Sequence, residues 1–217
     1  ANPSPNKILT HLPVDIDLYA FHKKNTTIPF STLDYSKFFC QKTIECHLKE
    51  DIYDAIVLED AKKVLVTFWG IKTLEVYDLE SGRHVKSLDG HSDSVMKIIR
   101  LQDGRVATAS KDKTIRIWNL EKGKTDIVFE GHTDWVTSLV ELPDLTLLSC
   151  SYDGTIRYWD LKKHDNTAFN KIIYRGTGQI YSMTLLENNT IAIGKDKFIE
   201  LIRFEDGLMM KALQAHK

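Results

Sequence analysis

Two sets of residues in this sequence contain the side-chain types of a nucleophile–base–acid triad. They are Thr108, His91 and Asp112 in one set and Ser149, His132 and Asp153 in the other. In such triads a hydroxyl attacks the substrate, an imidazole takes its proton and a carboxylate orients the imidazole. The two sets have the same internal spacing and lie 41 residues apart, from Thr108 to Ser149. A catalytic set should occur once, so the recurrence favours a structural role in which buried polar groups satisfy one another.

The repetition extends well beyond these six residues. Residues 90–95 (GHSDSV) recur as 131–136 (GHTDWV), and residues 110–118 (SKDKTIRIW) recur as 151–159 (SYDGTIRYW), both after 41 residues. A weaker copy at 67–78 lies one period earlier, with Tyr77 at the position of Trp118. Another, at 193–199, lies one period later with a two-residue slip, and Ile202 replaces the tryptophan. The sequence therefore consists largely of units of about 41 residues, and His216 is expected to open a further one.

Each unit has the pattern of a β-sheet. Short apolar stretches alternate with polar residues at period 2 and are separated by Gly, Asp, Asn and Lys. In the best-preserved unit these stretches are 95–99, 105–108, 114–118 and 126–129. Four strands with their turns account for the period. One such sheet cannot bury both of its faces alone, so we expect an all-β fold of stacked four-stranded sheets.

The residues that carry the repeat resemble the WD-repeat β-propeller family. The signature consists of the Gly-His pairs, the turn aspartates, Trp118-Asn119 and Trp159-Asp160, and with its degenerate copies it covers roughly residues 49–212. The resemblance implies a buried hydrogen-bond network that contains His91, Thr108, Asp112 and Trp118 in one blade and His132, Ser149, Asp153 and Trp159 in the next. The two flanking blades lack parts of this set, so we expect them to rely more on apolar packing. Four to five blades are fewer than the seven most common in the family, so we expect part of a larger propeller, closed by further residues or by a second chain.

Residues 1–48 do not show the clear repeat, and we separate them from the blades at 49–217. Two interpretations of this N-terminal segment remain. Residues 30–39 and 43–48 align loosely with the last two strands of a preceding blade. Alternatively, residues 12–16 (LPVDI) with Leu18 and Phe21 resemble the opening of an F-box, a helical motif that docks substrate receptors onto a ubiquitin-ligase adaptor.

The resemblance also implies where partners bind. In WD-repeat proteins they commonly contact the top face of the propeller, beside the first-strand valine and just before the turn aspartate. Carried over by position, the residues predicted to bind partners are Ser94, Met96, Lys111, Trp135, Thr137, Tyr152, Tyr181 and Lys195, accompanied by Asp51, Tyr53, Gly70 and Gln179. We expect Trp135, Tyr152, Tyr181 and Met96 to share one surface with few acidic groups, because exposed aromatic residues are usual interface anchors and methionine adapts to varied partners. The alternative is that Trp135 merely caps its own blade.

Together these patterns predict a non-catalytic scaffold that binds proteins or peptides. A ubiquitin-ligase substrate receptor is the alternative, and an enzyme is disfavoured because no unrepeated acid, base or metal cluster stands out. The net charge of −1, from 29 Lys+Arg and 30 Asp+Glu, gives no basic excess for nucleic acid. No apolar run approaches the roughly 20 residues that would span a bilayer.

The cysteines and histidines give no further site. Cys40, Cys46 and Cys150 form no disulfide framework, which favours a reducing compartment, the cytoplasm or alternatively the nucleus. Cys40, Cys46 and His47 fit no usual zinc spacing, and no glycine-rich phosphate loop is present. We therefore expect neither a metal nor a cofactor.

Overall fold

The computed structural model describes residues 7–9, 43–58, 61–162, 170–187 and 189–214, and every regular element among them is a strand. Four antiparallel sheets of four strands follow one another along this part of the chain. Blade one contains β3 (Ile52–Leu58), β4 (Lys63–Phe68), β5 (Leu74–Asp78) and β6 (His84–Leu88). Blade two contains β7 (Val95–Arg100), β8 (Val106–Ser110), β9 (Ile115–Asn119) and β10 (Lys124–Phe129). Blade three contains β11 (Val136–Leu142), β12 (Thr146–Ser151), β13 (Thr155–Asp160) and β14 (Asn170–Arg175), and blade four β15 (Ser182–Leu186), β16 (Thr190–Gly194), β17 (Phe198–Arg203) and β18 (Met209–Gln214).

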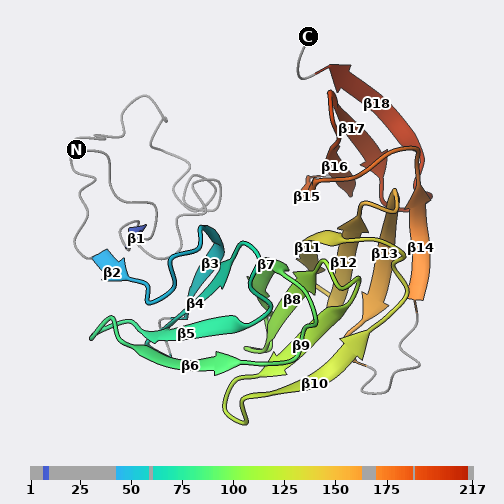
Figure 1. Ribbon diagram of the computed structural model, residues 1–217. Helices are drawn as coiled ribbons and strands as arrows, with labels where there is room; N and C mark the ends of the chain where they lie inside the picture. Colours follow the sequence, from blue (N-terminus) through green and yellow to red (C-terminus); the bar gives the residue numbers. More distant parts are fainter. Residues whose placement is uncertain (1–6, 10–42, 59–60, 163–169, 188, 215–217) are drawn as a thin grey trace, which may run out of the picture.

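The blades form an open arc (Figure 1). Consecutive strands pair within each blade, so every sheet is a meander that runs from the concave side of the arc to its convex side. The first strands β3, β7, β11 and β15 lie next to one another along the concave side. The predicted all-β fold of stacked four-stranded blades that form part of a propeller is therefore confirmed.

The turn after the second strand is tight in blade three. Gly154 has φ +77°, and a Cβ at this position would lie 2.7 Å from the carbonyl oxygen of Gly176. Glycine is therefore the residue that fits here. In blade two Lys113 occupies the aligned position with φ 72°.

Apolar side chains fill the spaces between neighbouring blades. Trp118 of blade two lies in one apolar cluster with Val76 and Leu88 of blade one, and Trp159 of blade three packs against blade two and stacks on Phe129. Both tryptophans are almost completely buried. Burying a large side chain stabilises by about 1.5–3 kcal/mol, so each blade depends on its neighbour.

The two end faces of the arc differ. On blade one, Val64, Val66, Phe68 and Tyr77 are covered by Ile44 and by partly buried residues of 46–52. On blade four, many large apolar side chains of the described residues are exposed, namely Leu186, Phe198, Ile199, Leu208, Met209, Met210 and Leu213.

The N-terminal segment is described only in part. Within the predicted strand at 43–48, Thr43–Glu45 forms β2, but β2 pairs with β1 (Lys7–Leu9) in a separate two-stranded sheet. The predicted strand at 30–39 and the F-box-like residues 12–21 lie outside the described residues, as does His216. Among the described residues, no helix has the length and hydropathy needed to cross a membrane.

Candidate functional site

A chain of hydrogen bonds links four side chains inside blade two. His91 Nδ1 lies 2.7 Å from Asp112 Oδ2, and His91 Nε2 lies 2.7 Å from Thr108 Oγ1. Trp118 Nε1 donates to the same Thr108 oxygen over 2.7 Å. Because Thr108 accepts from Trp118, its own proton is available to His91 Nε2, and His91 Nδ1–H then donates to Asp112. The histidine is therefore the neutral Nδ1–H tautomer.

Blade three repeats this arrangement with a serine. His132 lies 2.8 Å from Asp153 and 2.7 Å from Ser149, and Trp159 Nε1 donates to Ser149 over 2.8 Å. These distances would suit a catalytic triad. However, Ser149 and Thr108 are both 0% exposed and already engaged by a tryptophan, so a substrate does not reach them. The eight residues predicted to form a network are thus brought together in two copies, in the interior.

Burial and hydrogen bonding fix the charges in both copies. Burial lowers the pKa of His91 and His132, and the hydrogen bonds to the aspartates only partly oppose this. Burial alone would raise the pKa of Asp112 and Asp153, but hydrogen bonds from the histidines and from Thr114 and Thr155 lower it well below the usual range. At neutral pH each pair therefore consists of a neutral imidazole and a carboxylate.

Blade one contains a different polar cluster. Tyr77 takes the position of the tryptophan, is 0% exposed, and its hydroxyl lies 2.9 Å from His47 Nδ1. Glu75, which is 2% exposed, accepts hydrogen bonds from Thr73 Oγ1 over 2.6 Å and from Ser87 Oγ over 2.7 Å. His84 Nε2 lies 2.6 Å from the same carboxylate. In blade one, buried polar groups thus accompany the expected apolar packing of Val64, Val66 and Phe68 where the network is missing.

Blade four follows the expectation for a degenerate blade. Ile202, at the tryptophan position, is fully buried with Ile191 and Ile193. Its Asp196 is exposed and accepts a hydrogen bond from the hydroxyl of Tyr181 over 2.6 Å instead of holding a buried histidine.

Five aromatic side chains form a row across the top face, which is the end of the blades that carries the turns after the second strands. We call Tyr53, Trp69, Trp135, Tyr152 and Tyr181 the aromatic row. First strands begin and second strands end at this same end of an antiparallel sheet, which is why residues from both positions meet there. The ring centroids are 5.6 Å apart for Tyr53 and Trp69, 5.1 Å for the stacked Trp135 and Tyr152, and 5.0 Å for Tyr152 and Tyr181.

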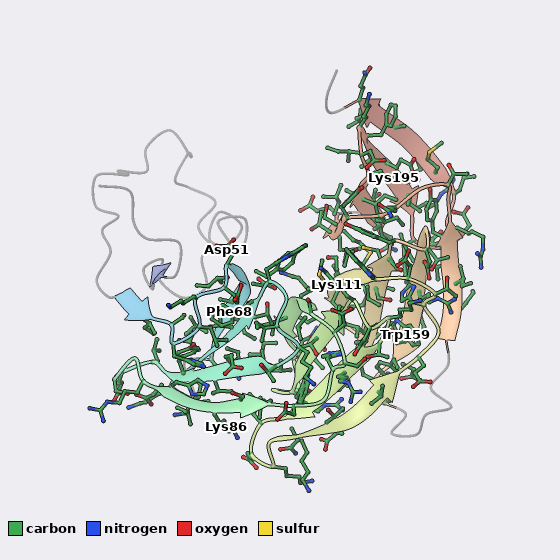
Figure 2. All side chains as sticks on the ribbon, viewed as in Figure 1. Asp51, Phe68, Lys86, Lys111, Trp159 and Lys195 are labelled. Atoms are coloured by element: carbon green, nitrogen blue, oxygen red, sulfur yellow. The ribbon has the colours of Figure 1, made fainter. Side chains whose placement is uncertain are left out.

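Lys111 of blade two joins the two parts of the row. Its Nζ lies 3.6 Å from the ring centroid of Trp69 and 4.3 Å from that of Trp135, within range of cation–π attraction on both sides. In Figure 2, Lys111 lies on the concave side of the arc, whereas Lys86 lies on its outer part. Blades one to four thus all contribute to one continuous surface.

The structure corrects part of the predicted partner-binding set. Met96, Ser94 and Thr137 are only 4%, 3% and 8% exposed, so they are interior residues. Thr137 donates a hydrogen bond to the carbonyl of Ile180 at blade four over 2.7 Å, which shows that it faces the neighbouring blade. Lys111 is also buried, between the two indoles. Tyr181 is exposed, and Trp135, Tyr152 and Lys195 are half-buried.

Other features of this surface were not predicted. Trp69 is 48% exposed but was not among the residues predicted to bind partners. The sequence signal that could have identified it is the next residue, Gly70, whose φ of +76° turns the chain there. Two acidic groups lie at this surface: Asp134 accepts the backbone N–H of Trp135, and Asp196 accepts the hydroxyl of Tyr181. Burial, Tyr53 and these two carboxylates together raise the pKa of Tyr152.

Comparison with known proteins identifies the repeats. The family described as "WD domain, G-beta repeat" matches residues 82–119 and 123–160. Each matched segment supplies the fourth strand of one blade and the first three strands of the next. No curated protein matches the chain. The chain therefore contains two WD repeats of this family, whose signature residues lie in two consecutive blades of an all-β arc.

Proposed function

We propose that this chain is a non-catalytic scaffold that binds a protein or peptide along the aromatic row. WD repeats generally mediate interactions between proteins, and this supports the class of function. The observation that carries the proposal is the row itself, in which side chains of four blades form one surface around Lys111. Exposed tryptophan and tyrosine side chains are typical energetic centres of interfaces.

The exposure of the row supports a partner that lies along it. Tyr53, Trp69 and Tyr181 are 43%, 48% and 41% exposed. Ring surface is therefore accessible to a partner at both ends of the aromatic row. Trp135 and Tyr152 are supported by their mutual stacking, which fixes them before a partner arrives. Little side-chain entropy is then lost on binding, because the rings are already ordered.

Affinity purification with mass spectrometry tests this function. Trp135→Ala and Tyr152→Ala should lose partners that the wild-type chain retains, while the melting temperature changes little. Val85→Ala is the control, since Val85 on β6 is an apolar side chain that is 47% exposed and lies outside both the row and the open end of the arc. If both row variants unfold and still retain the partners, the aromatic residues belong to the core and the proposal is wrong.

We extend the proposal to the open end of the arc at blade four. Its exposed apolar side chains are what a sheet face shows when it lacks a neighbour, and such surfaces favour association. Coverage by a further blade, from a longer parent chain or a second chain, would remove this surface from water. Light scattering of the 217-residue chain should show self-association. A monomer at all concentrations would contradict this part of the proposal.

We also assign this scaffold to the cytoplasm. Cys46 and Cys150 are free thiols among the described residues. Burial raises the pKa of Cys150 to about 12, so it stays a protonated, unreactive thiol. Both properties are typical of proteins in a reducing compartment. Fluorescence microscopy of the tagged chain tests the location, and a signal confined to the nucleus would contradict it.

A further inference from the structure

Three possible metal ligands meet at the edge of blade one. His84 Nε2 of β6 lies 2.6 Å from Glu75 Oε2 of β5, and His47 Nε2, from the segment after β2, lies 4.0 Å from the same oxygen. The ligand atoms of the three side chains all lie within 4.8 Å of one another. The two imidazole centroids are 4.1 Å apart, so both rings face one carboxylate from the same side.

Neighbouring side chains hold these groups in place. The carboxylate of Glu75 accepts the hydroxyls of Thr73 and Ser87. The hydroxyl of Tyr77 lies 2.9 Å from His47 Nδ1. A hydrogen bond from Nδ1–H to this oxygen would leave the lone pair of His47 Nε2 for a metal ion. Metal-binding histidines and carboxylates are usually fixed by such outer hydrogen bonds.

The three ligand atoms lie close enough to meet one cation. His84 Nε2 and His47 Nε2 lie 2.6 Å and 4.0 Å from the same oxygen of Glu75. A metal cation between the three side chains would contact both nitrogens and the oxygen together.

We propose that His47, Glu75 and His84 bind a Zn²⁺ ion. Two histidines and one carboxylate are a ligand set that zinc accepts, with a fourth position left for water. Zinc–ligand bonds of about 2.1 Å place tetrahedral ligand atoms about 3.4 Å apart. The 2.6 Å separation would therefore have to lengthen by about 0.8 Å and the 4.0 Å separation to shorten by about 0.6 Å. Side-chain exposures of 42% for His47 and 28% for His84 allow this adjustment and leave water access to the ion.

The ion would connect two parts of blade one that are distant in sequence. His47 follows β2, and the residues around it cover Val64, Val66 and Phe68 on the end face of the arc. Zinc would fasten this covering segment to β5 and β6. Because the folded site binds the ion and the unfolded chain does not offer it, zinc should also raise the stability of the chain.

Isothermal titration of the metal-free chain with ZnCl₂ tests the site, with thermal melts as the second readout. The wild type should bind one ion and melt at a higher temperature with zinc. Ser87→Ala, which removes an outer hydrogen bond, should weaken binding roughly 10- to 100-fold, and His84→Gln should weaken it further. Glu121→Gln, an exposed carboxylate on blade two, should bind as the wild type does.

Two results would overturn the proposal. One is a folded wild-type chain that shows neither heat of binding nor a shift of the melting temperature with zinc. The other is zinc binding of equal affinity in the wild type and in His84→Gln, which would place the ion elsewhere. His84→Gln retains a donor to Glu75, and its melting curve without zinc verifies that it is folded. None of these measurements depends on partner binding at the aromatic row.

Discussion

Blades one and three meet the same packing problem with different polar groups. Blade three places Trp159 over a neutral imidazole and a hydroxyl, and each donor in that set has an acceptor. Blade one places Tyr77 at the aligned position, beside His47 and the buried Glu75. Glu75 stands where blades two and three have Arg116 and Arg157, so the charge at this position is reversed. The family signature is thus one way to satisfy buried polar groups, and a blade can replace it with another.

The largest effect should come from the carboxylate of the closed network. Asp153→Ala removes the acceptor of His132 Nδ1–H, of Thr155 and of the backbone N–H of Thr133. Leaving buried donors unsatisfied should lower the free energy of unfolding by about 1–3 kcal/mol. Denaturant unfolding measures this loss. Asp126→Ala, an exposed aspartate on β10, is the control and should change stability little; an equal loss in both variants would refute the role of the network.

Acidification should weaken the two closed networks in two steps. The lowered pKa of His91 and His132 means that the unfolded chain binds more protons below its ordinary histidine pKa of 6.5. Stability should therefore fall as the pH drops below about 6.5, by up to about 1.4 kcal/mol per unit of pKa difference for each histidine. The aspartates, whose pKa is also lowered, add a second loss below about pH 4.

Unfolding measured from pH 8 to pH 3 checks both steps. In His132→Gln the first slope should be shallower, because one titrating group is gone. A slope that equals that of the wild type would show that His132 does not titrate differently in the folded chain.

A pair of hydroxyl deletions compares the two blades directly. Ser149→Ala leaves the N–H of Trp159 unsatisfied in the interior and should cost about 1–3 kcal/mol. Tyr77→Phe leaves Nδ1 of His47 without its partner, but this histidine is 42% exposed on its side chain and can bind water. Its cost should be about 0.5–1.5 kcal/mol. If thermal unfolding shows an equal loss of stability in both variants, the hydroxyl of Tyr77 contributes as much to stability as the hydroxyl of Ser149.

The smallest effect should come from the contact that links blade one to blade three. Lys111→Met keeps the length of the side chain but removes its charge from between Trp69 and Trp135. We expect a loss of about 0.5–1 kcal/mol, the usual cation–π contribution where water reaches the ring, because Trp69 is 48% exposed although Lys111 itself is buried. Chemical denaturation measures it, and Lys113→Met, a lysine in the same turn, is the control. An unchanged stability would show that the indoles do not gain from the charge.

The sequence allowed the middle of the molecule to be predicted better than its ends. Thr108, Asp112 and Trp118 could be assigned together because each recurs 41 residues later, and a recurring interval reveals contacts across distant strands. Met96 and Thr137 could not be placed correctly, because alternation along a strand does not tell which blade lies against a side chain. The His47, Glu75 and His84 cluster has no second copy, so nothing in the repeat pointed to it.

The offset between the matched segments and the blades has a consequence for truncation. Residues 82–119 contribute β6 to blade one and β7 to β9 to blade two, so a cut at either boundary of the repeat divides a sheet. Deleting this segment would remove the edge strand of one blade and leave β10 without its partner. The repeat of the sequence therefore does not coincide with the four-stranded sheet of the fold. Deleting one repeat disrupts two sheets.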